Sequence, residues 1–335
     1  MKLKFWAGIA VSLGLLIYLF SRIDLAKLWD AVRSVNPWYL ALIVAANISF
    51  FAVRAMRWRY LMDPVKRAVP FGSLFSATMI GFMANNLLPA RLGEFVRAYA
   101  LGRREDVPKS SVFASIVVER LFDGLAVLLL LIVTLVFLPP RIAGGDAAVR
   151  VREAGMVSLA LYVAAMGCLG FFLYRPHLLT RLVRGAVRPL SAGLAEKAAY
   201  MADSFMTGLG VVKKPGLLLL IVLYSAVHWG LMWIPTWLMF KAFGLDYGVY
   251  AAVFILVIMS FSVAVPSTPG YVGTFHAAAT GGMVLLGMDP GAALGFAIVS
   301  HAISFIPVTL IGLYCLSREN LSLKAIRKTE AGQQA

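Results

Sequence analysis

The sequence predicts an all-α polytopic membrane protein with six spanning helices and two oppositely inserted re-entrant helical hairpins, as in transporters built from inverted repeats. Its 335 residues are 61% hydrophobic and 14% charged, and the mean hydropathy is +0.83. A water-soluble core of this size cannot hide so much apolar surface. The apolar residues form long unbroken runs rather than the short alternating segments of a spanning β-barrel, so we expect helices in lipid.

The charge pattern favours contact with a membrane surface over contact with nucleic acid. The formal net charge is +15, but the basic residues lie in short clusters between apolar runs. Cys168 and Cys315 each lie inside an apolar run without a CxxC partner, so they cannot form a zinc site. We therefore expect no nucleic-acid partner, no metal and no cofactor.

Six apolar runs have the length of a complete crossing. Lys2 and Lys4 precede the first run, which resembles a signal peptide but lacks a small-x-small cleavage pattern, so we expect a retained span. The six predicted spans are Phe5–Phe20, Trp38–Met56, Ser111–Leu138, Gly155–Tyr174, Gly216–Phe240 and Gly291–Leu316.

Two further apolar regions are interrupted, and the charges around them predict that neither crosses the membrane. The region Phe71–Leu101 is broken at 85–94 and has Lys and Arg clusters on both sides, so both of its ends are expected in the cytoplasm. The region Tyr250–Leu286 is broken at 266–270, and its flanking loops hold no Lys or Arg. The first is predicted to be a hairpin inserted from the cytoplasmic side and the second a hairpin inserted from the opposite side.

With this topology, the cytoplasmic segments hold 20 of the 31 basic residues and the outer loops hold six. Both termini are then cytoplasmic, and a bacterial-type inner membrane is expected. The longest non-spanning segment, residues 175–214, carries Arg181, Arg184 and Arg188, which share one face of a helix. This segment is either an interfacial amphipathic helix that touches anionic lipids at the cytoplasmic face or an ordinary basic loop.

The two interruptions share the pattern P-x-x-x-G-x-F, which begins at Pro89 and again 180 residues later at Pro269. Broken helices at corresponding positions of two inverted halves indicate a transporter site near the midplane of the membrane. We expect one domain over 1–316, inverted repeats at about 38–140 and 216–316, and a cytoplasmic tail at 317–335. Gly93 and Gly273 are expected to approach the opposing hairpin closely. The predicted helix-break residues are Pro89, Gly93, Pro266, Pro269, Gly270 and Gly273.

Charged residues follow the first interruption at helical spacing. Arg91, Glu94 and Arg97 share a face, and in the next span Ser111, Ser115, Glu119 and Asp123 recur every four residues, with Arg120 about 100° around the helix. A central Arg or Asp costs about 2.5 to 3.5 kcal/mol on insertion scales, so these residues must face one another or water. Two interpretations remain open. Internal ion pairs lock the hairpin, or Arg91, Arg97 and Arg120 bind an anionic headgroup while the acids hold them in place.

Uncharged polar residues complete the candidate substrate site. Asn85 and Asn86 lie at the first interruption, and Ser267, Thr268 and Tyr271 lie at the second. His276 and His301 are either packing residues or proton carriers. Arg54 and Arg57, at the cytoplasmic end of their span, are expected to snorkel to the membrane surface.

Three segments together resemble a known family. They are 86–97 (NLLPARLGEFVR), 115–123 (SIVVERLFD) and 266–273 (PSTPGYVG). They are similar to the lysylphosphatidylglycerol synthase transmembrane-region family, named for the flippase half of the bacterial multiple peptide resistance factor. The resemblance covers about residues 5–316 and implies translocation of a phospholipid or a lipid-linked saccharide between leaflets. The soluble aminoacyl-transferase domain of that factor has no counterpart after residue 316, so lipid synthesis is not implied.

The expected function is a lipid flippase of the cytoplasmic membrane rather than an enzyme, acting on an anionic or phosphate-bearing phospholipid or glycolipid. It is driven by the lipid gradient or a coupled ion, because the sequence contains no Walker A motif. Two alternatives remain open: a membrane-embedded lipid-modifying enzyme that uses the acids for general acid–base catalysis, and a non-transporting accessory of a glycosyltransferase or lipid synthase. The expected partners are the lipid substrate and, as further options, a second copy of the chain or a lipid-synthesis enzyme.

Overall fold

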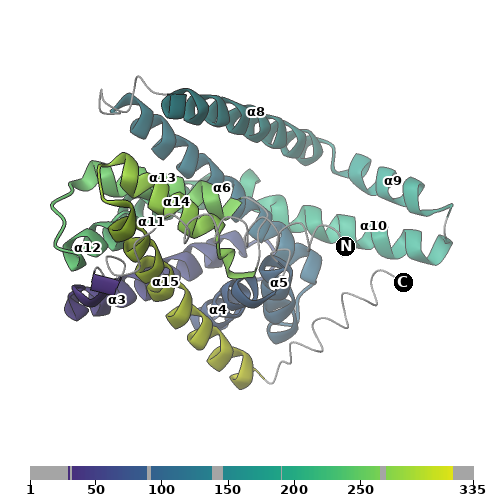
Figure 1. Cartoon of the computed structure of the whole chain (residues 1–335). Helices are drawn as coiled ribbons and strands as arrows, with labels where there is room; N and C mark the ends of the chain where they lie inside the picture. The colour runs from purple at the N-terminus through teal and green to yellow at the C-terminus, as the bar shows by residue number, and fades with distance from the viewer. Residues whose placement is uncertain are drawn as a thin grey trace.

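The computed structural model describes residues 29–30, 32–88, 92–137, 146–189, 191–264 and 269–319, and every regular element in these ranges is helical (Figure 1). The predicted first span and the predicted tail beyond residue 319 lie outside the described residues. So do five of the predicted break and site residues: Pro89, Arg91, Pro266, Ser267 and Thr268.

The first half of the bundle contains two long helices and one broken pair. These elements are α3 (Pro37–Leu61), α4 (Phe71–Leu87), α5 (Gly93–Arg104) and α6 (Lys109–Val136). Helix α3 begins where Asn36 accepts a hydrogen bond from the Trp38 amide at 3.0 Å. Pro37 then occupies the first turn, where its missing N–H has no cost.

The second half has the same order of elements. It contains α11 (Pro215–Leu231), α12 (Ile234–Ala242), α13 (Val249–Ala264), the short η3 (Pro269–Tyr271), α14 (Thr274–Leu285) and α15 (Pro290–Arg318). Helix α15 begins where Asp289 accepts from the amides of Gly291 and Ala292. The predicted span Gly216–Phe240 is divided between α11 and α12, because Pro235 in the first turn of α12 cannot donate to the preceding turn.

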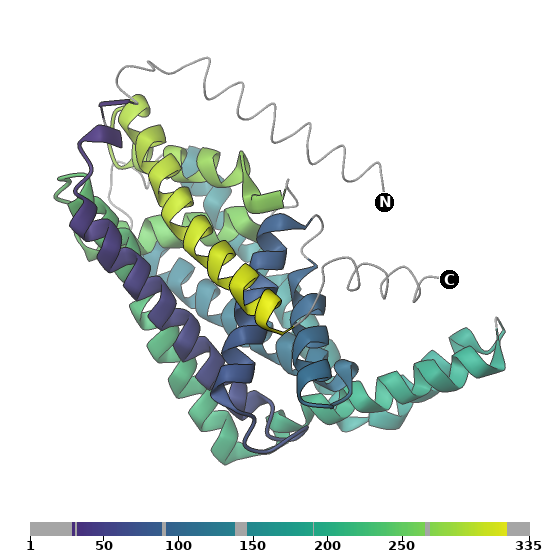
Figure 2. The same ribbon diagram turned by 90° about the horizontal axis from the view of Figure 1, so that it is seen from below.

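The two halves correspond in helix length as well as order. The broken pair has 17 and 12 residues in the first half, and 16 and 12 in the second. The closing helix has 28 residues in the first half and 29 in the second. Helix α4 packs on α15 and α13 packs on α6, so each broken pair lies against the closing helix of the other half (Figure 2).

A helical arm connects the halves. It comprises α8 (Asp146–Tyr174), α9 (Pro176–Val187), α10 (Ala192–Gly208) and the short η2 (Leu209–Lys213). The chain turns by 97° between α8 and α9. Helices α9 and α10 pack side by side and project from the bundle in both ribbon views, and Thr180 donates to Asp203 across them at 2.5 Å.

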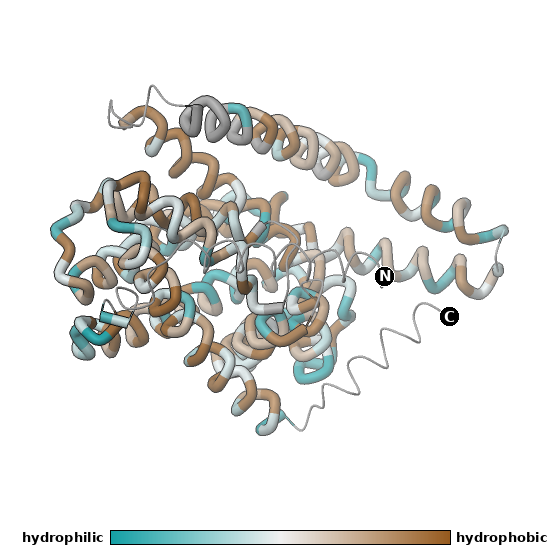
Figure 3. Tube along the Cα trace, in the orientation of Figure 1, coloured by the Kyte–Doolittle hydropathy of each residue, from teal (hydrophilic) through white to brown (hydrophobic). Residues whose placement is uncertain are grey.

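Three described helices are long and apolar enough to cross a membrane, and a fourth crossing exists if the bent α8–α9 pair counts as one. The three are Pro37–Leu61, Pro215–Ala242, in which α11 and α12 are taken together as one span, and Pro290–Arg318, and they match three of the six predicted spans. The predicted span Ser111–Leu138 forms α6, a 28-residue helix that carries three charges near its middle. Leu129, Leu161 and Leu310 are more than half exposed, and Figure 3 shows apolar residues along much of α6, α8 and α15. The chain is a multi-pass membrane protein.

Candidate functional site

A cluster of ionised side chains occupies the centre of the first half, where α3, α5 and α6 meet. Its two inner carboxylates, Glu119 and Asp123 on α6, are buried. We call these seven residues the arginine cluster, and each makes at least one ion pair with another member: Arg54, Arg57, Glu94, Arg97, Glu119, Arg120 and Asp123.

Glu119 is the hub of the arginine cluster. Arg97 donates to both of its carboxylate oxygens, from Nη1 to Oε1 at 2.8 Å and from Nη2 to Oε2 at 2.9 Å. Arg54 donates from Nε to Oε1 at 2.7 Å, and Arg57 Nη2 lies 3.8 Å from the same oxygen. This bidentate geometry is specific to arginine, because a lysine ammonium cannot supply two parallel donors.

Asp123 lies one helical turn further along α6 and joins the remaining groups. It accepts from Arg57 Nη2 at 2.8 Å, from Arg54 Nη2, and from the indole N–H of Trp229 on α11 at 3.1 Å. Its Oδ2 also lies 3.5 Å from Arg120 Nη1. The carboxylate therefore connects the first half of the bundle to α11 of the second.

Neutral side chains hold the inner arginines in place. The Arg97 guanidinium carbon lies 3.6 Å from the centre of the Trp58 ring, and Trp58 donates from its indole to Ser115 Oγ at 2.9 Å. Arg57 donates from Nη1 to Ser225 Oγ on α11 at 3.0 Å. Ring stacking on Arg97 and hydrogen bonds to the terminal nitrogens of both arginines hold these guanidinium groups in a fixed geometry.

Arg120 and Glu94 form the accessible edge of the arginine cluster. Arg120 Nη2 lies 3.2 Å from Glu94 Oε1, and their side chains are 38% and 24% exposed, whereas those of Arg57 and Glu119 are fully buried. Asn85 orients this edge: it accepts from the Gly93 amide at 2.8 Å and donates to Glu94 Oε1 at 3.5 Å. The first helix break thus lies directly beside the exposed pair.

The arginine cluster carries an excess of positive charge. Its described residues hold four guanidinium groups against three carboxylates. Within the part of the chain that the structure describes, Nε of Arg57, Arg97 and Arg120 are buried without a hydrogen-bond partner. Buried charge without compensation is costly, so an anion that approaches Arg120 gains both charge and hydrogen-bond complementarity.

The expectation for Arg54 and Arg57 was wrong, since both are buried in the arginine cluster rather than extended to the membrane surface. The spacing of Glu119 and Asp123 could have indicated that Arg54 and Arg57 are buried. Two carboxylates one turn apart in a span require more than the single neighbouring Arg120 to compensate them. Arg54 and Arg57 are three residues apart on α3 and therefore share the face that meets α6.

The second helix break forms a separate group of polar residues. Its backbone has positive φ at Gly270 (74°), Tyr271 (59°) and Gly273 (93°). His301 on α15 donates from Nε2 to the Gly270 carbonyl at 2.8 Å, and the Gly273 amide donates to His276 Nδ1 at 3.4 Å. The centroids of the two imidazole rings lie 4.8 Å apart.

The two breaks meet through Gly270 rather than through Gly93. A Cβ at Gly270 would lie 3.4 Å from the Asn86 carbonyl oxygen on α4, and Asn86 itself donates to Thr309 Oγ1 on α15 at 2.9 Å. Gly93 approaches α4 of its own hairpin, where a Cβ would lie 2.1 Å from the Gly81 carbonyl oxygen. Gly93 was therefore predicted correctly as a close-approach residue and wrongly as a contact with the opposing hairpin.

The predicted site residues thus fall into two neighbouring groups. Asn85, Glu94, Arg97, Glu119, Arg120 and Asp123 lie in or beside the arginine cluster. Asn86, Gly270, Gly273, His276 and His301 belong to the second break and its contacts with α4 and α15. No group of three His, Cys, Asp or Glu with metal-binding geometry occurs among the described residues.

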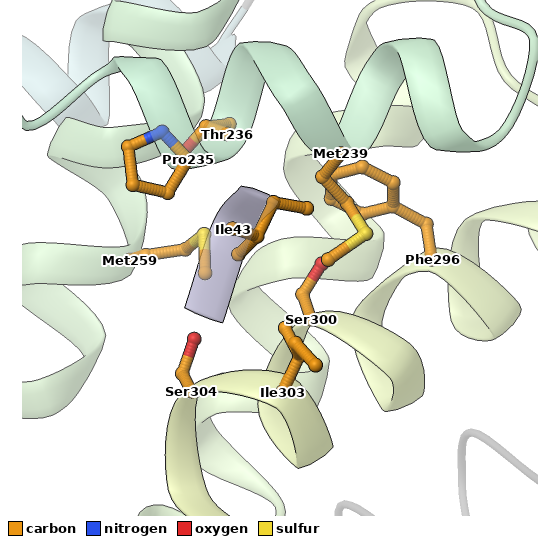
Figure 4. Close-up of a pocket in the computed structure, with 9 residues that line it drawn as sticks. All are labelled: Ile43, Pro235, Thr236, Met239, Met259, Phe296, Ser300, Ile303 and Ser304. Atoms are coloured by element: carbon orange, nitrogen blue, oxygen red, sulfur yellow. The ribbon is translucent and has the colours of Figure 1, made fainter. Parts of the chain in front are cut away.

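A small cavity of about 30 Å³ lies between α3, α12, α13 and α15 (Figure 4). Ile43, Met239, Met259 and Phe296 supply most of its apolar wall, and Ser300 and Ser304 supply hydroxyl groups. This volume accommodates water rather than a lipid headgroup.

Comparison with known proteins identifies a family that this chain matches. Residues 5–312 match the family described as the lysylphosphatidylglycerol synthase TM region. A UPF0104 membrane protein of Methanothermobacter thermautotrophicus is 26% identical over 310 residues, which is 85% of this chain and 86% of the relative. Another, from Pyrococcus horikoshii, is 23% identical over 331 residues, 95% of this chain and 94% of the relative. Glycosyltransferase AglD of Haloferax volcanii is 27% identical over 334 residues, 91% of this chain. The match spans about half of AglD, 53% of its length. No solved structure matches.

Proposed function

Because the chain belongs to the lysylphosphatidylglycerol synthase transmembrane-region family, we propose that it is a lipid flippase that moves a phosphate-bearing lipid between the leaflets of the cytoplasmic membrane. The observation that carries the proposal is the excess positive charge of the arginine cluster, which is accessible only at Arg120. A site for a phosphate group needs such a charge beside a path for the headgroup.

The depth of Arg120 suits a translocation site. It lies eleven residues after Lys109, the first residue of α6, or about 17 Å along a helix that is about 42 Å long. The hydrocarbon core is about 30 Å thick, so Arg120 is expected near the midplane. An accessible guanidinium at that depth has an unfavourable free energy in the protein without bound lipid, and a bound lipid phosphate offsets it.

The lengths of the broken helices support re-entrant insertion. Helices α5 and α14 have 12 residues each and are about 18 Å long, too short to cross a core of about 30 Å. Basic residues flank the α4–α5 pair, and none flanks the α13–α14 pair. The proposed topology therefore has the two pairs entering from opposite faces, with both termini cytoplasmic.

The mechanism follows from the exchange of one anion for another at Arg120. In the resting state Glu94 occupies Arg120 at 3.2 Å. A lipid phosphate displaces this carboxylate and accepts from the same guanidinium, while Glu119 and Asp123 keep the inner arginines fixed. The headgroup then passes the meeting point of the two breaks while its acyl chains remain in hydrocarbon. Release follows when Glu94 returns to Arg120.

The amphipathic helix α9 is proposed to rest on anionic lipid at the cytoplasmic face. Arg184 pairs with Glu196 on α10 at 3.1 Å with both side chains exposed, and Leu182 is also exposed. An apolar side chain beside basic ones suits the boundary between headgroups and acyl chains.

One alternative has specific support. A relative is named glycosyltransferase AglD, and this chain matches about half of its length, 53%. The second candidate function is therefore that of a non-transporting partner of a glycosyltransferase. Purified protein reconstituted alone separates the two functions. A flippase moves fluorescent phosphatidylglycerol in those vesicles well above the rate in protein-free vesicles, whereas an accessory leaves that rate unchanged.

A further inference from the structure

The second helix break holds a pair of histidines that the lipid-binding mechanism does not use. His276 is buried on α14 and His301 is partly buried on α15. Their rings meet edge to face, with an interplanar angle of 85°. Resting on the proposed flippase function, we propose that this pair binds one proton and is the site where transport is coupled to a proton gradient.

The hydrogen bonds fix which ring atoms can accept the proton. A carbonyl oxygen only accepts, so His301 Nε2 carries hydrogen in its bond to Gly270 O, and its Nδ1 is the basic atom. His276 accepts the Gly273 amide at Nδ1, so that atom carries the lone pair. In this arrangement both rings are neutral. One added proton occupies one of the two Nδ1 atoms, and two adjacent imidazolium rings would repel each other.

Protonation of His276 changes the geometry of the break. A protonated Nδ1 donates and cannot accept from the Gly273 amide, so the hydrogen bond at the start of α14 is lost. Gly273 has φ of 93°, a conformation that only glycine adopts readily, and the neighbouring Gly270 lies against Asn86 of α4. A proton at this position therefore alters the break where it contacts α4 of the first half.

His276 and His301 are the two histidines at the second break, and apolar rings surround them. Phe275 and Phe305 contact the His301 ring. The elements packed on α14 and α15 are α3, α4, α12, α13 and η3. The other titratable residues of these elements and of α15 are Tyr39, Arg54, Arg57, Arg59, Tyr60, Lys241, Tyr250, Tyr271, Tyr314, Cys315 and Arg318. The last three lie at least 13 residues beyond His301, or about 20 Å along α15. Among the described residues, no Asp, Glu, Lys or Arg pairs with either ring.

The correspondence of the two halves gives independent support. His301 lies eleven residues after Pro290, the start of α15, just as Arg120 lies eleven residues after Lys109, the start of α6. At this depth the closing helix carries Glu119 and Arg120 in the first half and His301 in the second. The proposed carrier thus has its anion site in one half and a group with a switchable charge at a similar depth in the other.

Two substitutions separate proton binding from structural support. His276→Asn keeps an acceptor near the position of Nδ1 for the Gly273 amide, and His301→Gln keeps a donor near the position of Nε2 for the Gly270 carbonyl, but neither amide takes up a proton. His177 on α9 is exposed, so His177→Gln is the matched control. If the two histidines only support the structure, all three variants should transport lipid as the wild type does.

The assay measures phosphatidylglycerol movement in proteoliposomes with equal or unequal pH on the two sides. We expect a pH gradient to change the wild-type and His177→Gln rates at least fivefold. His276→Asn and His301→Gln should lose that dependence while keeping their rate at equal pH within about twofold. Wild-type transport that ignores the gradient, or variants that still respond to it, would overturn the proton site but leave the flippase proposal intact. No lipid movement by the wild type would remove the flippase proposal and this inference with it.

Discussion

Replacement of Glu119 by Gln should be among the most damaging isosteric changes to the protein. Glu119 lies within 4 Å of three guanidinium groups, those of Arg54, Arg57 and Arg97, at 2.7, 3.8 and 2.8 Å. Gln preserves the shape but removes the charge, which leaves Arg54 and Arg57 with Asp123 alone and leaves Arg97 without a carboxylate partner among the described residues. Breaking a buried ion pair costs about 3 to 5 kcal/mol, and the bidentate bond to Arg97 places Glu119→Gln at about 5 kcal/mol.

The matched control is Glu105→Gln. Glu105 pairs with Lys66 at 2.9 Å, and the two side chains are 8% and 41% exposed, so loss of this partly exposed pair should cost about 1 kcal/mol. Unfolding of purified protein in mixed detergent micelles gives both free energies. A double-mutant cycle with Arg97→Gln should give a coupling energy above about 1 kcal/mol. The ion-pair explanation would be refuted by a Glu119→Gln variant as stable as Glu105→Gln.

Three further predictions test topology, packing and membrane contact. Cysteines at Gly72 and Arg103 should react with an impermeant thiol reagent from one side and a cysteine at Asp246 from the other; labelling of Gly72 and Arg103 from opposite sides would exclude the first hairpin. Gly312→Ala should lower the free energy of unfolding by about 1 to 3 kcal/mol, because the new Cβ would lie 2.3 Å from Met83 Cβ at the α4–α15 contact. The control Gly230→Ala has no neighbour within 4 Å and should not be destabilised in this way. Equal unfolding free energies for the two variants would contradict the prediction. Hydrogen exchange of α9 should slow in nanodiscs containing phosphatidylglycerol relative to phosphatidylcholine, and neutralising Arg181, Arg184 and Arg188 should abolish the difference; exchange that ignores lipid charge would favour an ordinary loop.

The helical class and most of the long helices could be predicted, because hydrophobic runs and Pro or Asn caps are local signals. Pro37, Pro215 and Pro290 each open a helix that was predicted within one residue. The division of α11 from α12 was missed, since the apolar run continues through Pro235 without a change in composition. Helix α6 has an expected length but holds charges that only tertiary pairing makes tolerable.

The sequence predicts which site residues share a face of one helix, but not which helices come together at the site. Glu119, Arg120 and Asp123 were identified from their spacing, and the structure places Arg120 at 3.2 Å from Glu94 and at 3.5 Å from Asp123. The contribution of Arg54 depends on how α3 packs against α6, and helix packing is not encoded in spacing within either helix. The contact between Gly270 and Asn86 likewise joins segments that are far apart in the chain.

The most direct test of the proposed site compares Arg120→Gln with Arg59→Gln in the phosphatidylglycerol transport assay. Arg120 is the accessible cation of the arginine cluster, whereas Arg59 is exposed on α3 outside it. Arg120→Gln should lower the rate at least tenfold while its unfolding free energy stays within about 1 kcal/mol of wild type, because its side chain is 38% exposed. Arg120→Lys should recover part of the rate, since it keeps the charge and loses the fork of donors, and Arg59→Gln should match wild type. A folded Arg120→Gln variant that moves lipid at the wild-type rate would contradict the assignment of the site.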